Sequence, residues 1–134
     1  MDAYLTAEAF QSLTALAQLS KNPKASGYLL GHKRGYRFVV EKIVSAANAA
    51  RPTPESDHRL DRLFRGKVIG FFTFTEDKKL REAILKPYAC GKILLGVRRA
   101  KNRGLSFRAF RIDYEGRFFM VPIEVLRDKE GSHE

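Results

Sequence analysis

The spacing of apolar residues along the chain predicts three helices. Between residues 6 and 22, apolar side chains recur three and four positions apart, as on one helix face, and a proline ends the pattern. The same spacing follows Thr53 and Pro54, where threonine caps a helix and proline suits its first turn. A third helix is expected after Thr75, with acidic residues in its first turn and a proline beyond its end.

Short runs of apolar and β-branched residues predict the strands, over residues 27–31, 36–44, 67–74, 93–97, 105–114 and 117–125. The third run is apolar throughout, as expected for a central strand covered on both faces. The last run contains Pro122, which has no N–H for a sheet ladder, so this strand is expected at a sheet edge.

These elements alternate in the order helix, strand, strand, helix, strand, helix and three strands, which is a mixed α/β layout. The chain has 134 residues, of which 44% are hydrophobic, enough for one domain with its own core. We expect the α/β fold class and a single domain over residues 1–134, built as a mixed, curved β-sheet flanked by about three helices. Its core is expected at about 5–125, with a frayed polar tail at 126–134.

The chain is strongly basic, and its cations are unevenly spread. Its 25 Lys and Arg against 15 Asp and Glu give a net charge of +10, and no acid occurs in residues 9–40 or 85–112. Such a surface attracts polyanions, although it also serves solubility alone. The second stretch supplies the possible anion-binding residues, which are Arg98, Arg99, Lys101, Arg103, Arg108 and Arg111.

The composition also bears on the compartment. No run approaches 18 uncharged apolar residues, so a transmembrane helix and a membrane partner are not expected. The first residues lack the basic and apolar regions of a secretory signal, and the single cysteine, Cys90, allows no intrachain disulfide. We therefore expect a cytoplasmic protein.

Sequence motifs of common catalytic and cofactor sites are absent. The glycines form neither a dinucleotide-binding nor a Walker pattern, and no two histidines stand at metal-ligand spacing, so no cofactor or metal is expected. An enzyme of unrecognised chemistry would need a pocket lined by some of five side chains, which are His32, Glu41, Asp57, His58 and Cys90.

Three segments in this order resemble the JAB/MPN domain family: Lys24-Ala-Ser-Gly-Tyr-Leu-Leu-Gly31, Val68-Ile-Gly-Phe-Phe-Thr-Phe-Thr75 and Leu105-Ser-Phe-Arg-Ala-Phe-Arg-Ile112. The resemblance covers about residues 5–125 and implies the JAB/MPN fold, with its cytidine-deaminase-like layering. Active members are zinc isopeptidases with a Glu at the start of the first segment, three residues before its first glycine, a His-x-His at the end of the second, and a Ser and an Asp further on.

At the matched positions this chain keeps none of those residues. Lys24 replaces the Glu, Thr73 and Thr75 replace the two histidines, and Ala83 and Lys86 stand at the Ser and Asp positions. Threonine is a poor zinc ligand and lysine repels a dication. The resemblance therefore implies a catalytically inactive, metal-free domain, a pseudoenzyme, and not a protease.

Two functions remain open, besides the enzyme of unrecognised chemistry. One is a protein-binding or scaffold module, which self-associates or takes up a peptide on an edge strand around Phe118, Phe119 and Val121. The alternative is a basic domain that binds nucleic acid or another polyanion. If the two acid-free stretches converge on one face, nucleic-acid binding is favoured, and if they disperse, the scaffold is favoured.

Overall fold

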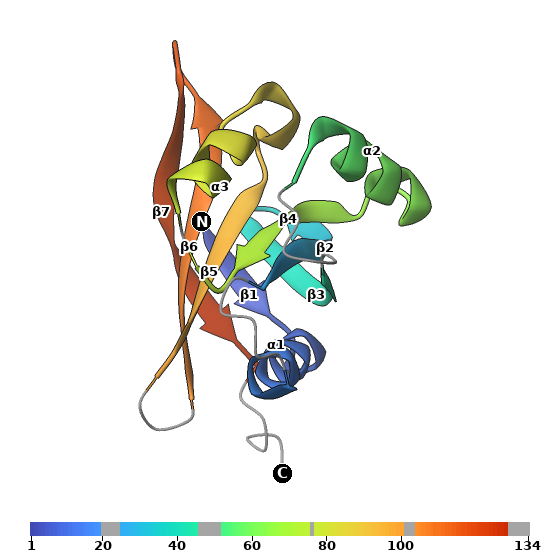
Figure 1. Ribbon diagram of the computed structural model, residues 1–134, viewed down its shortest axis with the longest axis vertical. Coiled ribbons are helices and arrows are strands. Elements are labelled where there is room, and N and C mark those ends of the chain that lie inside the picture. The colour runs from blue at the N-terminus through green and yellow to red at the C-terminus, as the bar shows by residue number, and fades with distance from the viewer. Residues whose placement is uncertain (20–24, 46–51, 76, 101–103, 129–134) are drawn as a thin grey trace.

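The computed structural model describes residues 1–19, 25–45, 52–75, 77–100 and 104–128, whose strands close into a barrel (Figure 1). Around the barrel the strands follow the order β1-β3-β2-β4-β5-β6-β7. Their bounds are β1 Asp2–Leu5, β2 Ser26–Arg34, β3 Arg37–Ser45, β4 Val68–Thr73, β5 Ile93–Arg99, β6 Leu105–Tyr114 and β7 Phe118–Arg127.

The helices begin close to the predicted positions. Helix α1 spans Ala7–Leu19, α2 Pro54–Leu63 and α3 Lys78–Ile84, and a 3-10 turn, η2, spans Pro87–Ala89. The start of α2 is confirmed, because the Thr53 hydroxyl accepts the Ser56 N–H and the Ser56 hydroxyl accepts the Thr53 N–H, both at 3.0 Å. Of the helices in the described part of the chain, none is long and apolar enough to cross a membrane.

The expected cap of α3 is wrong by two residues. Asp77, not Thr75, caps this helix, and its Oδ1 accepts the Leu80 N–H at 2.7 Å. The backbone of Thr75 is instead held by the side chain of Thr73.

Strand β1, which the sequence did not predict, closes the barrel. It pairs in parallel with β3 over Asp2↔Arg37 to Leu5↔Val40, and with β7 over Asp2↔Glu124 to Leu5↔Arg127. Its alternate residues Ala3 and Leu5 are fully buried. Inward-facing side chains therefore line the barrel from β1 as they do from the longer strands.

Two apolar clusters lie on opposite faces of the sheet. One draws on β1 to β6 and α1, includes Leu29, Phe72 and Leu95, and fills the barrel, with α1 at the end that is lowest in Figure 1. The other includes Phe71 and Leu94 and is covered by α3 and the residues around η2. Since neighbouring strand residues face opposite sides, each apolar strand serves both clusters, and the prediction that β4 is covered on both faces is confirmed.

The expected α/β fold class, a curved sheet flanked by helices in JAB/MPN-like layering, is wrong. The sheet closes on itself through β1, and most elements of the described chain are strands. The glycines that carried the resemblance have a local cause: a Cβ at Gly27 would lie 2.1 Å from the Val44 oxygen, and one at Gly31 1.8 Å from the Val39 oxygen. Glycine at these positions thus lets β3 approach β2 closely. The glycine pattern of this segment is explained by local packing, and it does not indicate membership of the JAB/MPN family or of its inactive members.

The strands β6 and β7 pair along only part of their length, near the place where β1 closes the barrel. Strand β7 pairs with β6 from Phe118↔Tyr114 to Ile123↔Ala109, and β1 takes over from Glu124. The predicted edge position of Pro122 therefore holds for the first half of β7 only. Among the described strands, none pairs with the far side of β6 over residues 105–108, because β7 has turned away to β1.

Candidate anion-binding pocket

Three neighbouring strands form one row where β4 and β5 end. Thr73 of β4 pairs with Gly96 of β5, and Gly96 pairs with Arg108 of β6. Two residues further along β5, Arg98 pairs with Ser106. Paired residues, and residues two apart on one strand, share a face of the sheet. All five residues therefore lie on the same face.

These residues line a pocket of about 310 Å³. Gly96 has no side chain, so space remains between the threonines at and just after the end of β4 and the arginines of β5 and β6. The complete lining is Thr73, Phe74, Thr75, Gly96, Val97, Arg98, Ser106 and Arg108. The pocket is small and suits a single polar group or side chain.

The hydroxyl of Thr73 shapes the wall of the pocket. The side chain is buried, its Oγ1 donates to the Thr75 carbonyl oxygen at 2.7 Å, and the Thr75 N–H donates back to Oγ1 at 3.1 Å. Both hydrogen bonds are local, as in the turns that threonine commonly stabilises. Thr73 thus ends β4 and directs the chain towards Asp77, and it has neither a metal nor a general base as a partner in these bonds.

Two arginines supply the charge of the pocket. Arg98 and Arg108 are exposed, and the guanidinium of Arg108 stacks 5.1 Å from the centroid of the Phe110 ring. They are diagonal neighbours across β5 and β6, a relation in which Cβ atoms lie about 7–8 Å apart. Guanidinium groups bind carboxylate or phosphate oxygens in pairs, so the two side chains offer several hydrogen-bond donors to an anionic group in the pocket.

The lining of the pocket, as described, holds no carboxylate, imidazole or thiol. Throughout the described residues, moreover, no three His, Cys, Asp or Glu side chains lie close enough together to hold a metal ion. The guanidinium and hydroxyl groups of the described lining can bind and orient an anionic group, and none of these described side chains is a usual general base.

The other predicted anion-binding residues lie elsewhere. Arg99, on the opposite face of β5, donates to the Ala17 carbonyl oxygen at 3.0 and 3.2 Å and stacks on Phe74, so it caps the end of α1. Arg111 donates to Asp113 at 2.8 Å. Lys101 and Arg103 lie outside the described residues.

The positions matched to the zinc isopeptidases do not form a site together. Thr73 and Thr75 line the pocket, whereas Ala83 lies in α3, where its carbonyl oxygen accepts from the Tyr88 hydroxyl at 2.7 Å. Lys86 is exposed just before η2. Lys24 lies outside the described residues.

The two acid-free stretches place their described cations at opposite ends of the barrel. Strand β2 runs antiparallel to β4, so Lys33 and Arg34 lie beyond the first residues of β4. Strand β5 runs parallel to β4, so Arg98 and Arg99 lie beyond its last residues. The described basic residues disperse.

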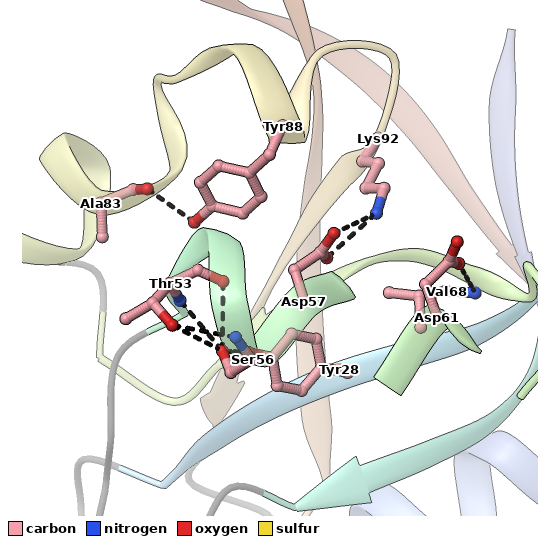
Figure 2. Close-up of polar contacts among 9 residues, drawn as sticks. All are labelled: Tyr28, Thr53, Ser56, Asp57, Asp61, Val68, Ala83, Tyr88 and Lys92. Atoms are coloured by element: carbon pink, nitrogen blue, oxygen red, sulfur yellow. Dashed lines mark hydrogen bonds and ion pairs between the residues drawn. The ribbon is translucent and has the colours of Figure 1, made fainter. Parts of the chain in front are cut away.

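A second polar region lies under α2 and is internally satisfied (Figure 2). The carboxylate of Asp57, which is buried, accepts two hydrogen bonds from the Lys92 ammonium at 2.9 and 3.0 Å. Asp61 accepts the Val68 N–H at 3.3 Å, and the hydroxyl of Tyr28 bonds to that of Ser56. These contacts fasten α2 to β2, β4 and the start of β5.

The tyrosines of this region are held in the protonated form. Burial raises the pKa of Tyr28, against the opposing hydrogen bond from Ser56. Burial also raises the pKa of Tyr88 strongly, with smaller contributions from Tyr28 and Asp57. Both rings pack on Phe71, at centroid distances of 5.7 and 6.1 Å. The tyrosines therefore stabilise the fold as neutral groups.

The five side chains proposed for an unrecognised enzyme divide into separate environments. His32 contacts Glu41 at 3.2 Å on the exposed surface of β2 and β3. Asp57 is paired with Lys92, and His58 and Cys90 are exposed. The structure thus gives no shared pocket to this set among the described cavities.

Sequence reasoning missed Gly96 and Ser106. A glycine inside the apolar run 93–97 is a signal, since glycine in a strand interior often marks a place where another group approaches closely. Ser106 gave no signal by itself, because its role depends on its pairing with Arg98.

Comparisons with known proteins support the fold and do not identify a family. Neither protein-family models nor curated protein sequences give a match. Among solved structures, the solution structure of protein DSY2949 from Desulfitobacterium hafniense is similar, with a TM-score of 0.68 over 98% of this chain and 97% of that one. At 17% identity the likeness shows the fold alone. The resemblance to the JAB/MPN family is therefore wrong, and the fold is a small closed β-barrel.

Proposed function

We propose that this protein is a non-catalytic binding module that takes an acidic group of a partner protein into the pocket at the ends of β4 and β5. The observation that carries this proposal is the convergence of Arg98 and Arg108 over Gly96, in a pocket whose described lining has no acid. A carboxylate or a phosphate in this pocket would accept several charge-assisted hydrogen bonds from the two guanidinium groups.

The distribution of charge favours a protein partner over nucleic acid. A nucleic-acid surface needs cations along a continuous stripe, so that several phosphates are neutralised together. Here Lys33 and Arg34 lie at the other end of the barrel from Arg98, while Arg99 and Arg111 bond to groups of the fold itself. One pocket with two arginines fits one acidic side chain better than it fits a strand of phosphates.

The chemistry of the lining favours binding over catalysis. Hydroxyl and guanidinium groups donate hydrogen bonds to an anion, but proton abstraction needs a base such as an imidazole or a carboxylate. The hydroxyl of Thr73, which is the buried nucleophile nearest to such a role, is bonded to the backbone of Thr75. We therefore expect the bound group to be held and not transformed.

Isothermal titration with three probes tests this function. The probes are a capped hexapeptide of alternating valine and glutamate, its valine and glutamine counterpart, and inorganic phosphate. We expect the glutamate peptide to bind and the glutamine peptide to bind at least about tenfold more weakly, because a hydrogen bond to a charged group contributes about 1.5–3 kcal/mol. If phosphate also binds at the pocket, a phosphorylated segment is the favoured source of the anion.

Two arginine variants locate the binding. Arg98→Gln and Arg108→Gln should each weaken the glutamate peptide about tenfold. Arg117→Gln is the matched control, because Arg117 is an exposed arginine at the β6–β7 turn, outside the pocket. Equal binding of the glutamate and glutamine peptides, or equal losses in all three variants, would refute the proposed function.

A further inference from the structure

The pocket lies beside a strand that has an open edge. Strand β6 pairs with β5 along residues 105–111, but its pairing with β7 stops at Ala109↔Ile123. Over residues 105–108, alternate N–H and C=O groups of β6 point away from β5, on a side where no described strand pairs with them. Such groups are a template for another strand.

A second cavity lies where β6 and β7 separate. It has a volume of about 280 Å³ and is lined mostly by apolar side chains, among them Phe107, Ile123 and Val125. Arg108 lines this cavity as well as the anion-binding pocket, so the two hollows adjoin at β6. The open edge of residues 105–108 therefore has an apolar hollow on one side and a basic pocket on the other.

We infer that this edge binds an extended acidic peptide by strand addition to β6, which rests on the proposed function and specifies its partner. In an added strand, successive side chains point to opposite faces. Residues on one face would meet Arg98 and Arg108, and those on the other would meet the face of Phe107. The segment that fits has acidic residues at every second position and apolar residues between them.

The charge of the region selects this occupant over a second copy of the chain. The chain carries a net charge of +10, and two copies paired through β6 would place Arg108 of each on adjacent strands. Like charges on adjacent strands destabilise their pairing. An acidic peptide instead offers carboxylates to the guanidinium groups of Arg98 and Arg108 while its backbone completes the ladder.

Backbone methylation of the probe peptide separates strand addition from simple capture of a carboxylate. The hexapeptide of alternating valine and glutamate is made in two forms, with N-methyl groups on the valine nitrogens or on the glutamate nitrogens. In a strand, one of these two sets faces β6 and the other faces away. We expect one form to bind at least about tenfold more weakly to the full chain and the other to bind like the parent peptide.

Amide hydrogen exchange gives an independent measurement. On addition of the parent peptide, protection should rise at β6 within residues 105–108 and not at residues 118–121 of β7, the other partly open strand. If both methylated forms bind like the parent, or lose affinity equally, or if the protection appears at β7, strand addition to β6 is refuted. The proposed function fails separately, when the glutamate and glutamine peptides bind alike.

Discussion

Strand β5 has a cation near each end, and the structure uses the two differently. Before its first residue, Lys92 is bonded to the buried carboxylate of Asp57, and its side chain is only 18% exposed. Near its last residue, Arg98 is exposed beside Arg108, and the pocket they line has no carboxylate among its described residues. The first cation is paired with a carboxylate of the fold, whereas the described lining around the second contains none.

This difference separates stability from binding. Removal of one partner of a buried ion pair leaves an uncompensated charge, so such pairs are costly to break. An exposed cation contributes little to folding, and its position is free to be set by a ligand. The predictions below change one end of β5 at a time.

The largest effect is expected at the Lys92 end. Asp57→Ala should lower the free energy of unfolding by about 3 kcal/mol, because Lys92 would remain partly buried without its partner. Urea denaturation measures this loss. The double variant Asp57→Ala, Lys92→Met should recover part of the stability, since it removes both charges. A loss no larger than that of Arg98→Ala would contradict the comparison.

The same region should also lose stability at high pH. The pKa values of Tyr28 and Tyr88 are raised in the folded state above their ordinary value of 10.0. Their contribution is therefore complete below pH 10 and declines above it, when the unfolded state ionises first. Unfolding followed against pH should show this decline, and Tyr28→Phe together with Tyr88→Phe should make it shallower. An unchanged slope would contradict the assignment.

The local elements were predictable because their signals lie within a few residues. The capping residues at Thr53 and Pro54 mark α2, and the apolar run at 67–74 marks β4. Closure of the barrel gave no such signal. Strand β1 has four residues, too few to show a period, and its partners are β3 and the distant β7. Without β1, the other strands were interpreted as a curved sheet.

The candidate site was predictable only in part, for the same reason. Arg98 and Arg108 were identified from charge, but charge alone did not separate them from Arg99, which faces α1. Thr73 and Thr75 were identified through a family resemblance that the closed barrel overturns, although both line the pocket. Register across β4, β5 and β6 brings these residues together, and register depends on contacts between distant segments.

A smaller difference in stability is expected between variants of two neighbouring arginines, Arg98 and Arg99, at the end of β5. Arg99→Ala should cost about 0.5–1 kcal/mol, because it removes the hydrogen bonds to the Ala17 carbonyl oxygen at the end of α1 and the contact with Phe74. Arg98→Ala should change stability by less than about 0.5 kcal/mol, as surface substitutions commonly do. Thermal unfolding of the two variants side by side gives the difference. Equal losses would mean that Arg98 also supports the fold.

The weakest of the expected effects is the binding of nucleic acid. With a net charge of +10, the protein should bind a labelled single-stranded oligonucleotide weakly at low salt and without sequence preference. Because the described cations disperse, few phosphates can be neutralised together, and each contributes only about −0.7 to the slope of log affinity against log salt. We therefore expect a slope of about −1 to −2 and no measurable binding at physiological salt.

Charge reversal then shows which cations take part. Arg98→Glu with Arg108→Glu should lower the weak binding for all sequences alike, while Arg117→Glu, outside the pocket, should lower it less. Fluorescence anisotropy across a salt series measures both quantities. A much steeper slope, with binding that persists at physiological salt, would require a continuous basic surface. In that case the proposed difference between Lys92 and Arg98, at the two ends of β5, would be wrong, because cations at both ends would bind the same polyanion.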